Sequence, residues 1–140
     1  MIYVDTSVLV AALTRESETS RVQAWLQAQI PSELAISDWV TTEISSALAL
    51  KVRTGQLDSH QRALVLSKYR SLAQETFQTF VVTPGHFRLA AAFTDQFALG
   101  LRSGDALHLA VASDFGMKVC TLDHRLAQAG VRLGICMVDP

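Results

Sequence analysis

Four carboxylates interrupt or close apolar segments of this chain, and they constrain its fold more than any other feature. Asp5 and Asp123 each end a short apolar run, which predicts that both lie at the carboxyl ends of buried strands. Glu43 and Asp105 each lie on or beside the apolar face of a predicted helix. An ionised carboxylate buried without a partner is costly, and several together require raised pKa values or a cation. The pattern therefore predicts a metal site.

The composition fits one compact domain that covers residues 1–140. The chain is 49% hydrophobic and 18% charged, which is enough apolar material for its own core. A formal net charge of −1 argues against a protein that holds nucleic acid through a broad basic surface. The apolar runs are too short to span a membrane, and Asp5 interrupts any signal-peptide core. We expect a cytoplasmic protein that does not contact a membrane.

The two cysteines do not show the spacing of metal ligands. Cys120 and Cys136 both fall inside predicted strands, where a thiol behaves as a small hydrophobe. We expect both to be reduced and structural, with a disulfide as the alternative.

Strand-like and helix-like segments alternate along the chain. Predicted strands cover residues 2–4, 34–36, 80–82, 119–122 and 135–138. Predicted helices cover residues 8–13 after caps at Thr6 and Ser7, and then 18–30, 38–48, 58–73, 87–97 and 103–115. Such alternation favours a three-layer α/β/α architecture around a central parallel sheet of four to five strands. No linker, low-complexity tract or internal repeat is present.

The predicted topology brings the four carboxylates to one edge. Ligands of parallel α/β sheets bind beyond the carboxyl ends of the strands. Asp5 and Asp123 occupy that edge, and the helices that carry Glu43 and Asp105 can direct their carboxylates into the same crevice.

Four sequence motifs together resemble the PIN-domain family. They are Tyr3–Ser7, the helix with Glu43, the stretch Leu101–Ala110, and the stretch Thr121–Leu126. They occur in the order and at the separations typical of the family, and the match covers essentially the whole chain. Within the family, the chain resembles the VapC-type toxins of bacterial and archaeal toxin–antitoxin pairs.

This resemblance implies a metal-dependent endoribonuclease with a Mg²⁺ or Mn²⁺ site. The matching metal-binding and catalytic residues are Asp5, Glu43, Asp105 and Asp123. Hard divalent cations prefer oxygen ligands, so the chemistry suits these residue types independently of the family. One ion or two could be held, to stabilise the oxygens of a phosphodiester. The resemblance also implies an RNA substrate, self-association and a small VapB-like antitoxin.

Three of these residues also have a structural interpretation, whereas Glu43 has no capping role in the middle of its helix. Asp5 could be only a helix cap, Asp105 a favourable first-turn charge, and Asp123 the start of a turn. Polar neighbours of the acids could orient them, although helix capping or packing explains each equally well. These possible supporting residues are Thr6, Ser7, Ser103 and Thr121.

Two histidines lie beside the acids. His108 follows Asp105 by three residues, where a lone histidine is commonly a buried residue with satisfied hydrogen bonds. His124 follows Asp123 and could meet RNA phosphate, or could simply occupy an exposed turn.

Two other functions are compatible with the sequence. A phosphatase could use Asp5 as a covalent nucleophile, but position 7 is serine where such enzymes place a second aspartate. A catalytically silent binding module would keep the fold for partner interaction only. The intact set of acids favours the nuclease over both.

The predicted helices carry more apolar side chains than one sheet of this size can cover. These are Leu9, Leu13, Leu48, Leu50, Val52, Leu57, Leu64 and Leu66. Exposed apolar faces commonly mark partner surfaces. We therefore expect a homodimer that also binds an antitoxin through the first four helices, with a basic antitoxin side chain near the acids.

Overall fold

A five-stranded parallel sheet forms the centre of the molecule. The computed structural model describes residues 1–140. In chain order, the strands are β1 (Ile2–Val4), β2 (Leu34–Ser37), β3 (Gln78–Phe80), β4 (Lys118–Cys120) and β5 (Met137–Val138). Their spatial order is β3-β2-β1-β4-β5, and every pairing is parallel. This confirms the predicted sheet.

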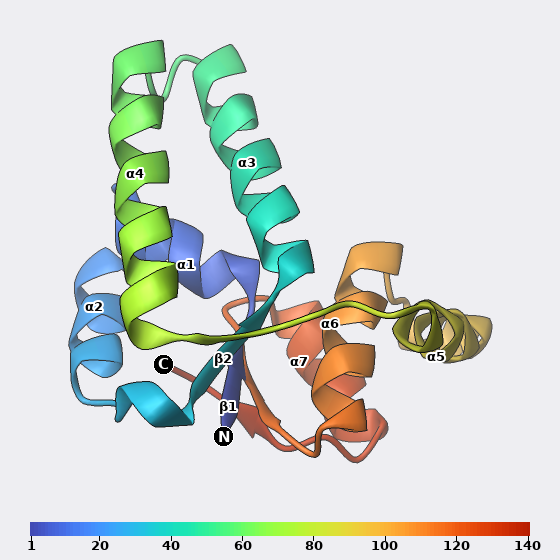
Figure 1. The fold of residues 1–140 in the computed structure, drawn as a ribbon. Helices are drawn as coiled ribbons and strands as arrows, with labels where there is room; N and C mark the ends of the chain where they lie inside the picture. Colours follow the sequence, from blue (N-terminus) through green and yellow to red (C-terminus); the bar gives the residue numbers. More distant parts are fainter.

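Helices cover both faces of the sheet (Figure 1). One layer consists of α1 (Thr6–Leu13), α2 (Thr19–Gln27), α3 (Asp38–Arg53) and α4 (Ser59–Thr76). The other layer consists of α5 (Pro84–Asp95), α6 (Ser103–Asp114) and α7 (His124–Arg132). Two short 3₁₀ turns, η1 (Pro31–Glu33) and η2 (Phe97–Leu99), complete the chain. The architecture is therefore the predicted three-layer α/β/α arrangement.

The strand order creates a switch point beside β1. The chain adds β2 and β3 on one side of β1, and then β4 and β5 on the other. The backbone N–H of Asp5 donates to the carbonyl oxygen of Cys120 at 3.1 Å, so the ends of β1 and β4 are held together. Ligand crevices of open parallel sheets lie at such a point.

Helix α6 is the most deeply buried helix. Its residues 106–112 are all buried, and Leu109 is completely inaccessible. A helix that is apolar all round must be enclosed by other elements. This burial fixes where α6 begins, and therefore where the carboxylate of Asp105 lies.

Several predicted elements have different bounds in the structure, and one helix was not predicted. The third strand covers Gln78–Phe80 rather than 80–82, because its partner β2 ends at Ser37, opposite Phe80. The fourth strand ends at Cys120, so Asp123 follows it after a short turn. Helix α7, of 9 residues, was not predicted, because the sequence after Asp123 is also compatible with an exposed turn.

Helix α1 begins differently from the prediction. Its N-cap is Asp5, whose side chain accepts from the backbone N–H groups of Ser7 and Val8, and Thr6 and Ser7 are its first two residues. Both cysteines are free, as predicted, but Cys136 is exposed and precedes β5 instead of lying within it. None of the helices is long and apolar enough to cross a membrane.

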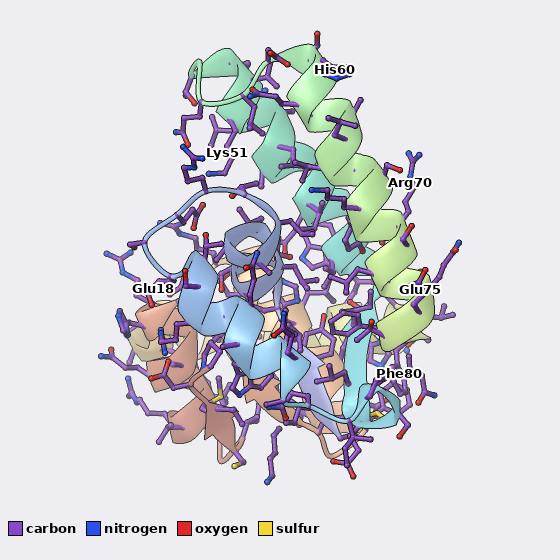
Figure 2. The ribbon with its side chains drawn as sticks, turned by 90° about the vertical axis from the view of Figure 1, so that its left-hand side faces the viewer. Glu18, Lys51, His60, Arg70, Glu75 and Phe80 are labelled. Carbon is purple, nitrogen blue, oxygen red and sulfur yellow. The ribbon has the colours of Figure 1, made fainter.

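Helices α3 and α4 form a hairpin that projects from the sheet (Figure 1). Lys51 and His60 lie toward its free end, whereas Glu75 and Phe80 lie near the sheet (Figure 2). Lys51 is tied to Glu16, in the connection between α1 and α2, by a 2.8 Å ion pair.

The apolar side chains that were expected at a partner surface divide into three groups, of which the half-buried one contains Leu13, Val52, Leu57 and Leu66. Leu9 and Leu48 are buried in the core, so the prediction was wrong for these two. Their helix faces meet the neighbouring helices of the same layer. Leu50 and Leu64 are each 52% exposed near the free end of the hairpin. An apolar surface is therefore present on the hairpin, but it is smaller than predicted.

Candidate functional site

All four predicted carboxylates line one open cavity of about 280 Å³. It lies at the carboxyl edge of the sheet, beside the switch point between β1 and β4. Its lining residues are Asp5, Thr6, Ser7, Glu43, Ser46, Ala47, Asp105, His108 and Asp123. They come from the ends of two strands and from the helices α1, α3 and α6, so the fold brings together residues that are far apart in the sequence.

Asp5 is only 4% exposed, and four hydrogen bonds hold its carboxylate in place. Its Oδ1 accepts from the Ser7 backbone at 3.0 Å, the Ser7 hydroxyl at 2.6 Å and the Val8 backbone at 3.4 Å. Its Oδ2 accepts from the Thr121 hydroxyl at 2.7 Å. Burial raises the pKa of Asp5, while His108 and these hydrogen bonds partly oppose that effect. Asp5 is therefore a helix cap that also presents a carboxylate to the cavity.

Glu43 lies in the second turn of α3, and both of its hydrogen bonds fall on one oxygen. Its Oε2 accepts from the Thr6 hydroxyl at 2.5 Å and contacts Nε2 of His108 at 2.6 Å. Burial raises the pKa of Glu43, but the hydrogen bond and charge of His108, together with Thr6 and Trp39, outweigh burial, so the pKa is lowered overall. Glu43 is thus an ionised carboxylate that is anchored on one side only.

Asp105 and Asp123 face the same cavity with less support. Burial raises the pKa of Asp105, and the nearby negative charges of Asp123 and Glu43 raise it further. Asp123 is the N-cap of α7, and its Oδ1 accepts from the backbone of Arg125 at 2.7 Å and of Leu126 at 3.1 Å. The cavity therefore concentrates negative charge that the protein neutralises only in part.

The predicted supporting residues have different positions. Thr6 donates to Glu43, and Ser7 and Thr121 donate to Asp5. The Thr121 hydroxyl also accepts from the backbone N–H of Asp123 at 2.9 Å, which links two of the acids. Ser103 lies elsewhere: it lines a neighbouring apolar cavity of about 300 Å³ with Trp39, Phe87, Ala90, Ala91, Thr94, Gly104 and Leu107.

Four residues at this site were not predicted. The Tyr3 hydroxyl contacts both Ser37 and His108 beneath the cavity, and a tyrosine inside an apolar strand was the only signal for these contacts. A Cβ atom on Gly104 would lie 2.9 Å from Oε1 of Glu43, so this glycine leaves room for the carboxylate. The Trp39 indole is near enough to help lower the pKa of Glu43, yet its Nε1 has no hydrogen-bond partner.

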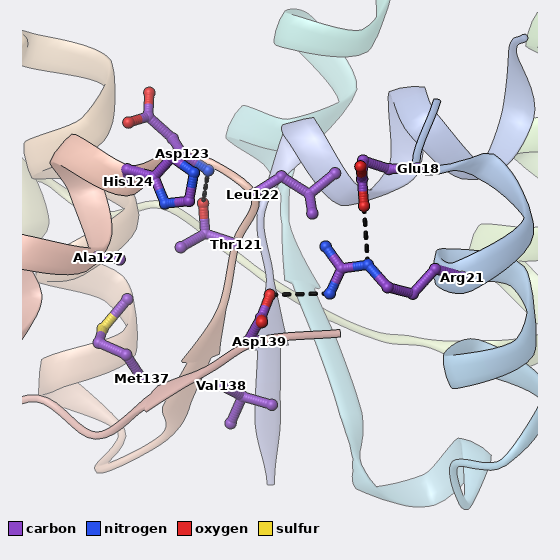
Figure 3. A pocket seen from close by; sticks show the side chains of 10 residues that line it. All are labelled: Glu18, Arg21, Thr121, Leu122, Asp123, His124, Ala127, Met137, Val138 and Asp139. Carbon is purple, nitrogen blue, oxygen red and sulfur yellow. Dashed lines mark hydrogen bonds and ion pairs between the residues drawn. The ribbon is translucent and has the colours of Figure 1, made fainter. Parts of the chain in front are cut away.

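His124 lies in a different cavity from His108. It lines a larger space of about 440 Å³ on the far side of Asp123, together with Arg21 (Figure 3). Arg21 pairs there with Glu18 at 2.7 Å and Asp139 at 3.0 Å. Its positive charge is therefore already engaged by carboxylates.

We predict that, in buffer with a chelator at about pH 8, Asp5→Asn melts no lower than the wild-type protein. The pKa of Asp5 is raised in the folded state, so the folded chain binds a proton more readily than the unfolded chain. Wild-type stability therefore gains from this group as pH falls through its folded pKa. The amide lacks that gain, so the difference in melting temperature should narrow between about pH 8 and pH 4.

Asp58→Asn provides the matched control, because Asp58 is also a helix N-cap but is exposed at the free end of the hairpin. The difference in melting temperature between Asp58→Asn and the wild type should not narrow in this way as the pH falls. A difference between Asp5→Asn and the wild type that stays constant over the whole range would contradict a buried-charge explanation.

Comparison with known proteins agrees with the fold and the motifs. The PIN domain family profile matches residues 2–131. Ribonuclease VapC46 of Mycobacterium tuberculosis is 29% identical over 143 residues, which cover 99% of this chain and 97% of that protein.

Solved structures of toxins and of toxin–antitoxin complexes share the fold. VapC20 of Mycobacterium tuberculosis, a sarcin-ricin loop cleaving toxin, superposes with a TM-score of 0.74 at 17% identity, over 93% of this chain and 95% of that one. A toxin–antitoxin complex from Klebsiella pneumoniae gives a TM-score of 0.61 at 19% identity, over 88% and 87% of the two chains. Because the family profile spans nearly the whole sequence, this chain belongs to the PIN domain family.

Proposed function

We propose that this protein is a VapC-type endoribonuclease that uses Mg²⁺ or Mn²⁺ to cleave RNA phosphodiester bonds. The observation that carries the proposal is the convergence of Asp5, Glu43, Asp105 and Asp123 on one cavity. Membership in the PIN domain family and similarity to Ribonuclease VapC46 support the same activity.

The residues present fit a divalent cation by their chemistry. The cavity lining contains four carboxylates and no lysine or arginine, and its hydroxyl groups add further oxygen donors. Oxygen-only donor sets suit Mg²⁺ and Mn²⁺. The four carboxylates line the same cavity without forming a preformed cluster of three ligands. The raised pKa values of Asp5 and Asp105 indicate negative charge that a cation would stabilise.

In the proposed mechanism, the four acids would hold the cation. A bound Mg²⁺ or Mn²⁺ supplies Lewis-acid stabilisation of the developing phosphate charge and activates water. Oδ2 of Asp5 accepts only one hydrogen bond and keeps a lone pair, whereas Oδ1 accepts three. Oε1 of Glu43 accepts no hydrogen bond of good geometry. These two oxygens are therefore available to a ligand.

The two alternative functions have less support. Asp5 is 4% exposed and both of its oxygens accept hydrogen bonds, which disfavours its attack on a phosphate as a phosphatase nucleophile. A silent binding module would not need four carboxylates on one cavity, because their mutual repulsion opposes folding.

We predict that Asp5→Asn and Glu43→Gln each lower cleavage of total RNA by at least about 100-fold while the fold survives. Each amide removes a ligand charge but keeps the side-chain shape. Cleavage by the wild-type protein should require added Mg²⁺ or Mn²⁺ and should stop with a chelator. The exposed-cap variant Asp58→Asn should cleave like the wild type. Chelator-sensitive cleavage at wild-type rates by both acid variants would refute the mechanism.

We predict that Gly104→Ala weakens cation binding without lowering the stability of the fold. An alanine Cβ would approach Oε1 of Glu43 to 2.9 Å, so the carboxylate must move, although alanine favours the helix by about 1 kcal/mol. We expect Mn²⁺ affinity, measured by calorimetry, to fall about tenfold without loss of thermal stability.

Gly85→Ala is the matched control, because Gly85 is likewise the second residue of a helix, and its added Cβ would meet only Thr83 and Arg88. Its Mn²⁺ affinity should equal that of the wild type. Equal affinities for both alanine variants would show that the position of Oε1 does not matter.

We further propose that the chain forms a homodimer and binds a small VapB-like antitoxin. Leu50 and Leu64 expose apolar surface on the α3–α4 hairpin, and a cavity of about 390 Å³ lies between Leu13 and α4. The solved toxin–antitoxin complex with this fold supports such a partner. Light scattering at micromolar concentration tests the dimer, and a monomer there would exclude it.

The antitoxin should insert an arginine or lysine among Asp5, Glu43 and Asp105. An open carboxylate cluster attracts a cationic side chain as it attracts a metal ion. The purified complex should be inactive, and excess Mn²⁺ should partly restore cleavage. Replacing that basic residue with alanine should relieve inhibition. Unchanged inhibition would mean that the antitoxin blocks the cavity by its bulk alone.

A further inference from the structure

A buried chain of hydrogen bonds reaches Glu43 from beneath the cavity. The hydroxyl of Tyr3 lies 2.7 Å from the hydroxyl of Ser37 and 2.8 Å from Nδ1 of His108. His108 continues the chain through Nε2, which lies 2.6 Å from Oε2 of Glu43. Tyr3, Ser37 and His108 are each no more than 2% exposed, so solvent does not compete for these contacts.

The carboxylate determines the direction of the chain where it meets Glu43. An ionised carboxylate only accepts hydrogen bonds, so Nε2 of His108 must donate to Glu43. In the contacts of the Tyr3 hydroxyl with Nδ1 of His108 and with the Ser37 hydroxyl, either partner can donate. In both arrangements, the contact with Tyr3 holds the ring that carries the Nε2 donor.

Ser37 shows that the chain is not a by-product of local structure. It occupies the N-cap position of α3, where a serine side chain commonly caps the helix. Its hydroxyl makes no capping hydrogen bond and contacts Tyr3 instead. Packing alone does not explain these three buried polar side chains, because apolar residues of similar shape would fill the same space without needing hydrogen-bond partners.

We propose that His108, anchored by Tyr3, positions the Glu43 carboxylate for its ligand. His108 and Thr6 both occupy Oε2, so the carboxylate cannot rotate freely, and Oε1 stays available in the cavity. His108 is a positioning residue, because it acts on the ligand through Glu43. This inference rests on the proposed function, which makes Glu43 a cation ligand.

The test measures Mn²⁺ affinity by calorimetry without RNA, followed by the kinetics of RNA cleavage. His108→Leu removes the donor to Glu43 and should weaken Mn²⁺ binding about 10- to 100-fold. Tyr3→Phe removes one hydroxyl and should weaken it about 2- to 10-fold. His108→Gln retains an N–H donor near the position of Nε2 and should recover part of the loss. In cleavage, kcat should fall while KM for RNA stays unchanged, because His108 is buried.

Tyr69→Phe is the matched control. It removes a buried tyrosine hydroxyl that is 2.8 Å from Thr41 and does not touch the cavity. Its Mn²⁺ affinity should equal that of the wild type. Thermal melts of all variants separate loss of folding from loss of positioning, and the near-isosteric Tyr3→Phe keeps the test valid if His108→Leu does not fold.

Two outcomes separate the inference from the proposed function. If Glu43→Gln binds Mn²⁺ as tightly as the wild type, the proposed function itself fails. If Glu43→Gln binds weakly but folded His108→Leu binds within about twofold of the wild type, only the positioning role is overturned. Equal affinities for Tyr3→Phe and Tyr69→Phe would likewise remove the role of Tyr3.

Discussion

The cost of burying negative charge at the end of β1 shapes this molecule. Asp5 can be buried there only because the first turn of α1 supplies backbone donors and Thr121 supplies a hydroxyl from beyond β4. These donors require β1 and β4 to be neighbours and α1 to begin immediately after β1. The switch in strand order and the tight strand-to-helix turn are thus conditions for accommodating one carboxylate.

The two helix layers meet at the same carboxylate cavity. Glu43 comes from the layer of α1 to α4, while Asp105 and His108 come from the opposite layer. The 2.6 Å contact between His108 and Glu43 crosses this boundary above the edge of the sheet. The geometry of the site therefore depends on how the two layers are placed. A shift of α6 relative to α3 would change the contact between His108 and Glu43.

The order of elements and the edge at which the acids gather could be predicted from the sequence, because both depend on local pattern and on the general topology of parallel sheets. Helix α7 was missed because it is short, and because the residues after Asp123 are equally compatible with an exposed turn. The contacts of Ser37 and Gly104 could not be predicted for a different reason. They depend on which faces of α3 and α6 meet, and no spacing within either segment encodes that meeting.

The position of β1 has a consequence for the order in which the protein acquires its parts during synthesis. The α3–α4 hairpin spans residues 38–76 and is built from contacts that are local in sequence, which form quickly. By contrast, Asp5 and Glu43 can form their contacts only after Thr121 and His108, respectively, have been synthesised. A ribosome must therefore deliver most of the chain before the acidic cavity exists, whereas the hairpin is available to a partner much earlier. A partner that binds the hairpin can therefore bind the growing chain before the acidic cavity has formed.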